Sequence, residues 1–165
     1  MRNFLYELKD YIIIVIVVIL IRTFIVTPAL VDGASMDNTL KDGHLVIINK
    51  INYKINNPKR FQIVVVKNES DKDKIIKRII GLPNETIEYK DNKLYINGKL
   101  INENYNHGNT LDFITTTSDN EYFVMGDNRE VSKDSRLLGN FKKEELIGSV
   151  NIRLYPFDKI GKIEK

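Results

Sequence analysis

The pattern of apolar and polar residues divides the chain into an apolar N-terminal segment and a longer, alternating remainder. Residues 11–21 are wholly apolar, the apolar character resumes through residue 26, and Pro28 then opposes further helix. Sixteen residues at about 1.5 Å each span roughly 24 Å, a little less than a ~30 Å hydrocarbon core. Extension toward the N-terminus, with Arg22 reaching the interface, closes the gap. The pattern predicts a single transmembrane helix as an anchor over residues 10–27.

Two other interpretations of this apolar segment are possible. A cleaved secretory signal peptide also has a short apolar region, but no small-x-small cleavage site follows here and Arg22 lies where one would form. A buried strand is the second alternative, although eleven unbroken apolar residues exceed most strands. Because Arg2 and Lys9 precede the segment, the positive-inside rule favours a cytoplasmic tail at residues 1–9 and an extracytoplasmic domain over residues 28–165.

After residue 28 the apolar positions come in short, often β-branched runs that predict strands. These runs cover residues 45–48, 61–66, 74–80, 86–90, 94–96, 121–125 and 149–154. Asn97-Gly98 predicts a hairpin turn, the polar residues 102–120 predict a loop, and residues 142–146 predict a helical turn. We therefore predict a mainly β, antiparallel catalytic domain with a small β lobe inserted at about residues 84–121.

Composition narrows the function classes that this chain can belong to. Its 165 residues suit one domain plus an anchor. It contains no cysteine, which excludes disulfides and thiolate metal sites, and we expect no metal or other cofactor. The net charge of +3 is spread without a long basic run, so a nucleic-acid partner is not expected.

Ser35 is a candidate nucleophile because it follows the anchor closely and lies between small residues in Gly33-Ala34-Ser35-Met36. A serine nucleophile needs a base. A Ser-His-Asp triad would require His44 or His107, but both occur in ordinary surface contexts.

Lys77 is the alternative base, because it lies in a predicted strand with apolar neighbours. Burial there would lower the pKa of the amine. A base that acts near neutrality needs a pKa of about 7–8 instead of about 10.4, a cost of roughly 4 kcal/mol. The alternative is that the Lys77 ammonium reaches solvent while its stem covers the core.

A third segment, residues 126–139, concentrates charged and hydroxyl side chains between two glycines directly after an apolar strand. We expect these side chains to hold one another through charge-assisted hydrogen bonds and to support a nearby amine. An ordinary solvated turn is the alternative. The candidate supporting residues are Asp127, Arg129, Ser132, Asp134 and Arg136.

Together, three motifs make the chain similar to the bacterial type I signal peptidases. The matches are Val31-x-Gly33-x-Ser35-Met36-x-x-Thr39-Leu40, then residues 77–83, and then Gly126-Asp127-Asn128-Arg129-x-x-Ser132-x-Asp134-Ser135-Arg136-x-x-Gly139. The resemblance covers nearly the whole chain. It implies that Ser35 is the nucleophile, Lys77 its general base and Ser132 a support for the lysine. It also implies a membrane-bound serine endopeptidase that removes signal peptides from secreted preproteins after small residues.

The resemblance also sets expectations about partners and departures. Preproteins and the lipid bilayer are the expected partners, the cell membrane is the expected location, and we expect a monomer. Asn38 stands where the family usually has proline, so φ is not fixed there. Gly33 offers no hydroxyl for an oxyanion hole, which leaves the Ser35 N–H as the one donor that the sequence identifies. A soluble, self-cleaving Ser–Lys repressor of the SOS type and an anchored, non-enzymatic β domain remain the rival hypotheses.

Overall fold

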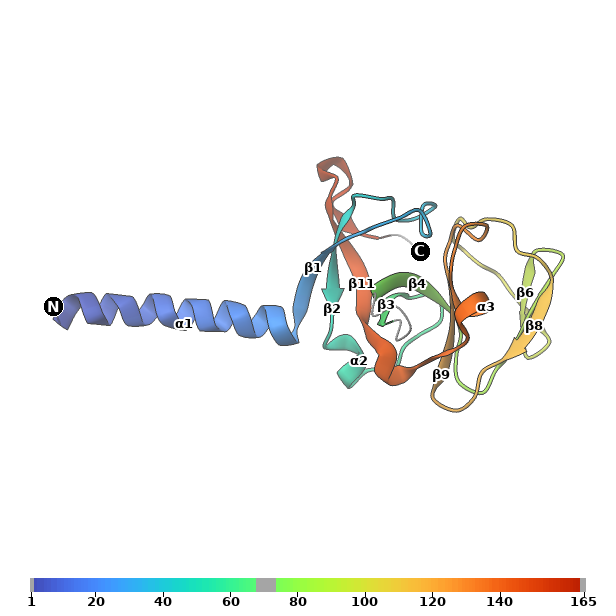
Figure 1. The fold of residues 1–165 in the computed structure, drawn as a ribbon, viewed down its shortest axis with the longest axis horizontal. Helices are drawn as coiled ribbons and strands as arrows, with labels where there is room; N and C mark the ends of the chain where they lie inside the picture. The colour runs from blue at the N-terminus through green and yellow to red at the C-terminus, as the bar shows by residue number, and fades with distance from the viewer. Residues whose placement is uncertain (1, 68–73, 164–165) are drawn as a thin grey trace.

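In the computed structural model, residues 2–67 and 74–163 are described. The chain begins with helix α1 (Arg2–Phe24), which projects away from the β domain (Figure 1). The apolar side chains at positions 11–21 are all exposed, by 42–68%. Among the described residues, no helix has the combination of length and apolar character needed to cross a membrane. The helix ends before the predicted anchor boundary at residue 27, because strand β1 (Val26–Leu30) already includes that residue.

The larger sheet joins distant parts of the chain in antiparallel pairs. In the described residues its order is β1-β2-β11-β3-β4-β9-β10, and β12 pairs with β11. After β1, its strands are β2 (Leu45–Asn49), β3 (Ile63–Lys67), β4 (Lys74–Gly81), β9 (Glu121–Met125), β10 (Phe141–Lys142), β11 (Leu146–Tyr155) and β12 (Gly161–Lys162). The sheet therefore places β4 beside β9. The second motif begins within β4, and the third motif begins directly after β9.

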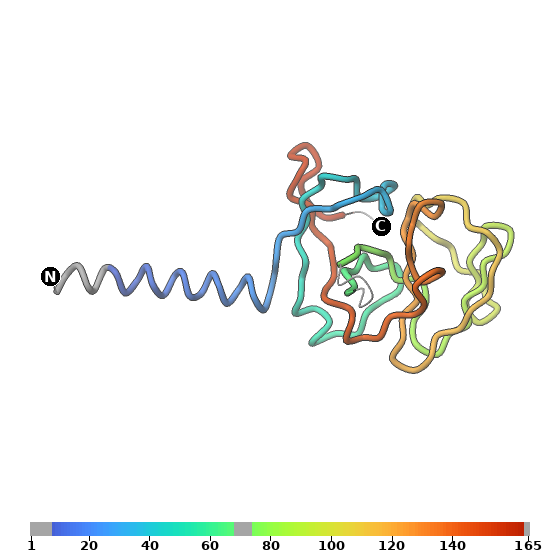
Figure 2. The backbone as a smooth tube through the Cα atoms, viewed as in Figure 1, coloured from blue at the N-terminus to red at the C-terminus, as the bar shows by residue number. Residues whose placement is uncertain are grey.

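Strands β5 to β8 form a separate, smaller sheet within the segment where the inserted lobe was predicted (Figure 2). They are β5 (Thr86–Lys90), β6 (Lys93–Ile96), β7 (Lys99–Ile101) and β8 (Phe113–Thr116), in the order β7-β6-β5-β8. The predicted hairpin turn is present, with φ of 50° at Asn97 and 75° at Gly98. The prediction of a loop over residues 102–120 is confirmed for residues 102–112 and 117–120 and was wrong for residues 113–116, which form β8.

Short helices connect the strands. They are α2 (Asn52–Ile55), α3 (Ser135–Leu138) and the 3-10 turns η1 (Lys143–Glu145) and η2 (Phe157–Lys159). The predicted helical turn at residues 142–146 corresponds to η1. The predicted strand at residues 61–66 begins two residues late, because Phe61 has a φ of 65° and cannot continue an extended strand.

The core of the main sheet holds the segment that follows β1. Met36 and Leu40 are 1% and 0% exposed and pack with Val46, Ile48 and Val65 in one buried cluster. Burying side chains of this size contributes about 1.5–3 kcal/mol each. The loop between β1 and β2 is therefore attached to the core by its own apolar residues, and this loop carries Ser35.

Candidate active site

The structure brings Ser35 and Lys77 together from separate elements. Ser35 lies in the loop after β1, and Lys77 lies in β4, paired in register with Val64 of β3. The Lys77 Nζ atom donates a hydrogen bond of 2.6 Å to the Ser35 Oγ atom. At this hydrogen-bond distance, a neutral Lys77 amine can accept the proton of the Ser35 hydroxyl directly.

Burial changes the acidity of Lys77. The residue is 3% exposed, and desolvation lowers the pKa of its amine from about 10.5 to about 8. The Asp134 carboxylate opposes this effect and raises the pKa, Arg136 lowers it further, and Asp127 raises it. Desolvation dominates because the charged ammonium loses water that the nearby carboxylates only partly replace.

Backbone contacts hold the loop that carries Ser35. The Asn128 N–H donates to the Ser35 carbonyl at 3.1 Å, and the Asn128 side-chain amide donates to the Ala34 carbonyl at 3.2 Å. On the other side, the Gly33 N–H donates to the Asp42 carboxylate at 2.9 Å. Gly33 has a φ of 88°, a left-handed conformation that glycine adopts readily. The loop thus presents Ser35 while Met36, the next residue, enters the core.

Gly126 allows the third motif to approach the Ser35 loop closely. A Cβ atom at Gly126 would lie 2.3 Å from the Ser132 Oγ atom and 2.4 Å from the Ser35 carbonyl oxygen. Ser132 is buried beside this contact. Its hydroxyl helps to lower the pKa of the Asp134 carboxyl but completes no well-aligned hydrogen bond among the described residues. The structure therefore places Ser132 next to the Ser35 backbone.

Asp127 pairs with Arg78, a residue that the sequence did not single out. Both side chains are 1% exposed, and the guanidinium binds the carboxylate at two points, with N–O distances of 2.8 and 2.6 Å. Arg78 also donates to the hydroxyl of Thr39 and to the carbonyl of Phe61. Its position directly after Lys77 in the motif was a signal for it. The pair connects β4, the third motif and the Ser35 loop.

Asp134 and Arg136 pair with each other, as we expected of this segment. The Arg136 guanidinium binds the Asp134 carboxylate at 2.9 and 2.8 Å and donates to the Arg129 carbonyl at 2.6 Å. The Asp134 carboxylate also accepts from the Gly126 N–H at 3.0 Å. Despite the desolvation that burial imposes on this carboxyl, these donors hold its pKa below the ordinary value. The segment is therefore an ordered, charge-assisted network and not a solvated turn.

Arg129 turns away from the other charges of its motif and binds the inserted lobe. Its guanidinium donates to Glu103 at 2.6 Å and to the hydroxyls of Tyr89, Tyr105 and Thr110. The Tyr105 ring also stacks on the guanidinium of Arg78, with 4.0 Å between the guanidinium carbon and the ring centre. The lobe residues of this network were missed, because Glu103 and Tyr105 lie in a polar stretch with no periodic pattern.

The two histidines lie elsewhere and do not complete a triad in the described residues. The His44 ring accepts from the Lys41 N–H at 3.1 Å, and His107 lies 3.3 Å from the Glu103 carboxylate. Within the described part of the chain, no group of three or more His, Asp or Glu side chains is gathered in a way that would hold a metal ion.

The comparison with known families identifies the kind of protein that carries this site. A family model described as "Signal peptidase, peptidase S26" matches residues 5–155. The chain belongs to this signal peptidase family. The resemblance predicted from the three motifs is confirmed, and family membership makes the protein a hydrolase of the signal peptidase type, whose family activity is the removal of signal peptides.

Individual relatives agree with the family match. The chain is 37% identical to signal peptidase IB of Staphylococcus aureus over 177 aligned positions, covering 93% of this chain and 92% of that one. It is 41% identical to signal peptidase I of Bacillus amyloliquefaciens, covering 93% and 89%. A crystal structure of a signal peptidase I from Enterococcus faecalis matches with a TM-score of 0.52 and 35% identity, covering 57% of this chain and 97% of that one. The mainly β, antiparallel fold of the signal-peptidase type is thereby confirmed.

Proposed function

We propose that this protein is a membrane-anchored serine endopeptidase that removes signal peptides from preproteins with a Ser35–Lys77 dyad. The observation that carries the proposal is the 2.6 Å hydrogen bond between the Lys77 Nζ atom and the Ser35 Oγ atom, made by a lysine whose pKa is lowered to about 8. At pH ~7 such a lysine is neutral in about one molecule in ten, and at pH ~8 in about half.

The reaction needs one nucleophile and one proton carrier. Neutral Lys77 takes the Ser35 proton while the Oγ atom attacks the carbonyl carbon of the scissile bond. The resulting ammonium returns this proton to the leaving amine, and an ester joins the signal peptide to Ser35. Lys77 then takes a proton from a water molecule that attacks the ester, and it passes this proton to the Ser35 Oγ atom as the ester bond breaks. The signal peptide leaves as a free acid, and the serine hydroxyl and the neutral lysine are restored. The Ser35 N–H makes no hydrogen bond within the described residues, and we assign it to the oxyanion.

The charged network supports this chemistry by holding the two reacting atoms in place. Asp127 connects the third motif to Arg78 of β4, and Arg129 connects it to the lobe. Asp134 and Arg136 bind each other within the motif. We assign these residues a positioning role because their side chains bind one another. Ser132 is assigned the same role, since it packs against Gly126 beside the Ser35 carbonyl.

We assign α1 to the membrane and the β domain to its outer face. The apolar, exposed side chains of residues 11–21 favour contact with lipid, and the basic residues of the preceding tail favour a cytoplasmic N-terminus. One helix then makes the protein single-pass, and it acts as a monomer on preproteins that share its bilayer. The preprotein lies extended along a strand edge, with small side chains before the cut.

Purified full-length protein in detergent, incubated with a secretory preprotein, tests the proposal directly. We expect a new N-terminus immediately after the signal peptide, identified by sequencing the product. Ser35→Ala and Lys77→Ala should each abolish this cleavage. Lys74→Ala is the matched control, because Lys74 lies on the same strand and is exposed, and it should cleave normally. Near-normal cleavage by Lys77→Ala would show that the dyad is wrong.

The same preparation separates the rival functions. A binding domain without activity would leave the preprotein intact and Ser35 unlabelled by a serine-directed acylating β-lactam. A self-cleaving protease of the repressor type would shorten this chain instead, which mass measurement of the intact protein detects.

A further inference from the structure

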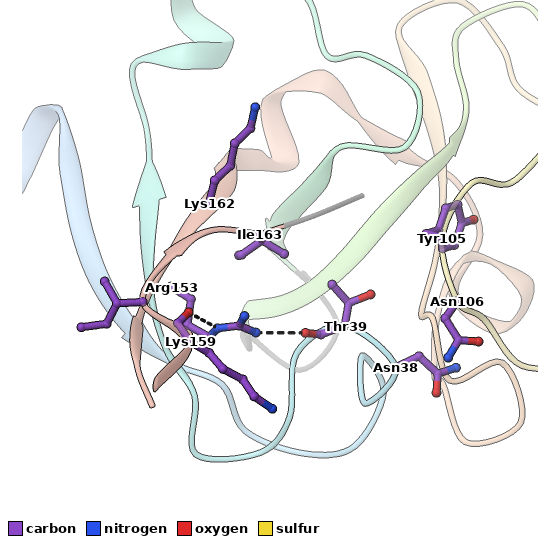
Figure 3. Close-up of a pocket in the computed structure, with 9 residues that line it drawn as sticks. Asn38, Thr39, Tyr105, Asn106, Arg153, Lys159, Lys162 and Ile163 are labelled. Carbon is purple, nitrogen blue, oxygen red and sulfur yellow. Dashed lines mark hydrogen bonds between the residues drawn. The ribbon is translucent and has the colours of Figure 1, made fainter. Parts of the chain in front are cut away.

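A basic pocket lies beside the loop that carries Ser35. Neither dyad residue lines it, and it borders the charged network at Thr39 and Tyr105. Its volume is about 370 Å³, and its lining includes Asn38 and Thr39 of that loop, Asn106 of the lobe segment, and Arg153 and Lys159 near the C-terminus. Lys162 adds a third cation, and none of the lining residues in the described chain is acidic. Figure 3 draws Arg153 and Lys159 on one side of this pocket and the two asparagine amides on the other.

Backbone acceptors hold Arg153 in a fixed position, and it has no counter-ion among residues 2–67 and 74–163. Its Nε atom donates to the Lys159 carbonyl at 2.9 Å and its Nη1 atom to the Thr39 carbonyl at 3.4 Å (Figure 3). Its Nη2 atom makes no hydrogen bond, and no carboxylate lies within salt-bridge distance of it, in residues 2–67 and 74–163. The guanidinium therefore keeps donors available for an anion, in a geometry that suits a carboxylate.

Burial and the positive charges at this end of the molecule both lower the pKa of a neighbouring side chain, His44. Burial lowers the pKa of His44 first, and the charges of Arg153, Lys159 and Lys41 lower it further. Asp158 opposes this effect as the last contribution. The cations near the pocket are thus compensated only in part by acidic residues.

We infer that this pocket binds an acidic side chain of the preprotein, close to the cleavage site on its mature side. The inference rests on the proposed function, because it places the substrate against Ser35. Thr39 follows Ser35 by four residues, so their Cα atoms are at most about 15 Å apart. An extended substrate rises ~3.3 Å per residue, so the Thr39 edge of the pocket lies within about four residues of the scissile bond.

The chemistry of the substrate decides which side of the cut supplies the anion. A signal peptide is apolar along its hydrophobic region and has small residues at the first and third positions before the cut, so these positions offer no carboxylate. The mature segment begins at the leaving amine and has no such restriction. Arg153 and Lys159 are accordingly specificity-determining residues for Asp or Glu at the second to fourth mature positions.

A charge-swap experiment on full-length protein in detergent tests this inference. The substrates are peptides with one signal-peptide segment that carry Glu, Gln or Lys at each of the second to fourth mature positions. At low salt, wild type should cleave the best Glu peptide about threefold faster than its Gln counterpart in kcat/KM, as expected for a partly exposed ion pair. Lys159→Glu should reverse the order and prefer the Lys peptide, and high salt should weaken both preferences.

Lys99→Glu is the matched control, because Lys99 is exposed on β7 of the lobe and the net charge changes equally. It should keep the wild-type order. Equal cleavage of all the peptides by active wild type would overturn the inference and leave the proposed function intact. Failure of wild type to cleave any peptide would overturn both.

A lipid phosphate is the other anion that such a pocket could bind. Vesicles of phosphatidylcholine with and without phosphatidylglycerol separate the two sources. If Lys159→Glu weakens binding to the phosphatidylglycerol vesicles and leaves the peptide preference unchanged, the pocket binds lipid and the substrate assignment is wrong. If it changes the peptide preference alone, the substrate assignment is supported.

Discussion

Replacing Lys77 by methionine should change how the stability of the domain depends on pH. The pKa of the folded-state amine is about 8, against an ordinary value of 10.5. The difference of about 2.5 pKa units corresponds to roughly 3 kcal/mol that folding loses by burying this amine in its charged form. Methionine has a similar length and no charge, so Lys77→Met removes this loss.

The sign follows from proton binding in the two states. Below pH ~8 both folded and unfolded chains hold the proton on Lys77, so the full desolvation cost applies. Between pH ~8 and ~10.5 the unfolded chain binds more protons than the folded chain, so the contribution of Lys77 to stability rises with pH. Integrated with these pKa values, the rise from pH ~7 to pH ~9.5 is about 2 kcal/mol.

Urea unfolding followed by circular dichroism measures this difference, because the chain has no tryptophan for fluorescence. The free energy of unfolding of wild type minus that of Lys77→Met should rise by about 2 kcal/mol between pH ~7 and ~9.5. Subtraction removes the groups that titrate equally in both proteins. Lys74→Met, at an exposed position of the same strand, should show no such rise. A flat difference for Lys77→Met would refute the lowered pKa.

Three further predictions concern the same site. The kcat/KM for preprotein cleavage should rise about tenfold per pH unit below pH ~8 and level off above it, as the titration of Lys77 to a pKa of about 8 requires. Asp127→Asn should lower the free energy of unfolding by about 3–5 kcal/mol, because it leaves the buried Arg78 guanidinium without its anion. Gly126→Ala should lower kcat by about 100-fold with the fold retained, because its methyl would displace the Ser35 carbonyl.

Each of these predictions has a control or a contrary outcome. A kcat/KM that levels off below pH ~7 would contradict the first. Asp119→Asn removes an exposed carboxylate and should change unfolding by less than about 0.5 kcal/mol; an equal loss in both asparagine variants would contradict the second. Gly98→Ala adds a methyl to open space on the lobe at a φ of 75°, so it strains the hairpin turn without contacting Ser35, and the third prediction requires it to cleave normally.

The parts of the site that follow local rules could be predicted from sequence. Lys77 lies among isoleucines in a β-branched strand, and this made it a candidate base, although the strand alone left open whether its amine is buried or reaches solvent. Ser35 and the charged motif are recognisable because their residue types and spacing are specific. Position in the chain, residue type and motif spacing were sufficient to select these residues, and the burial of the Lys77 amine required the structure.

The parts that depend on tertiary pairing could not be predicted. Glu103 and Tyr105 come from an aperiodic polar segment, and nothing local indicates that Arg129 binds them across 24 to 26 residues. Strand β8 was missed because its residues alternate between half-buried and exposed on a polar edge. Strand β1 was missed because it contains Pro28, which is tolerated there since β1 is the edge of its sheet and pairs with β2 alone.

The separation of the reacting atoms depends more on the third motif than on the strand that carries the lysine. Lys77 is fixed by the central strands. Ser35 lies in a loop whose backbone accepts a hydrogen bond from Asn128, and this loop can approach closely because Gly126 has no side chain. The third motif is in turn fixed by buried ion pairs to β4 and to the lobe. A change in the lobe should therefore alter the Ser35–Lys77 distance, and with it the rate of proton transfer, without touching either residue.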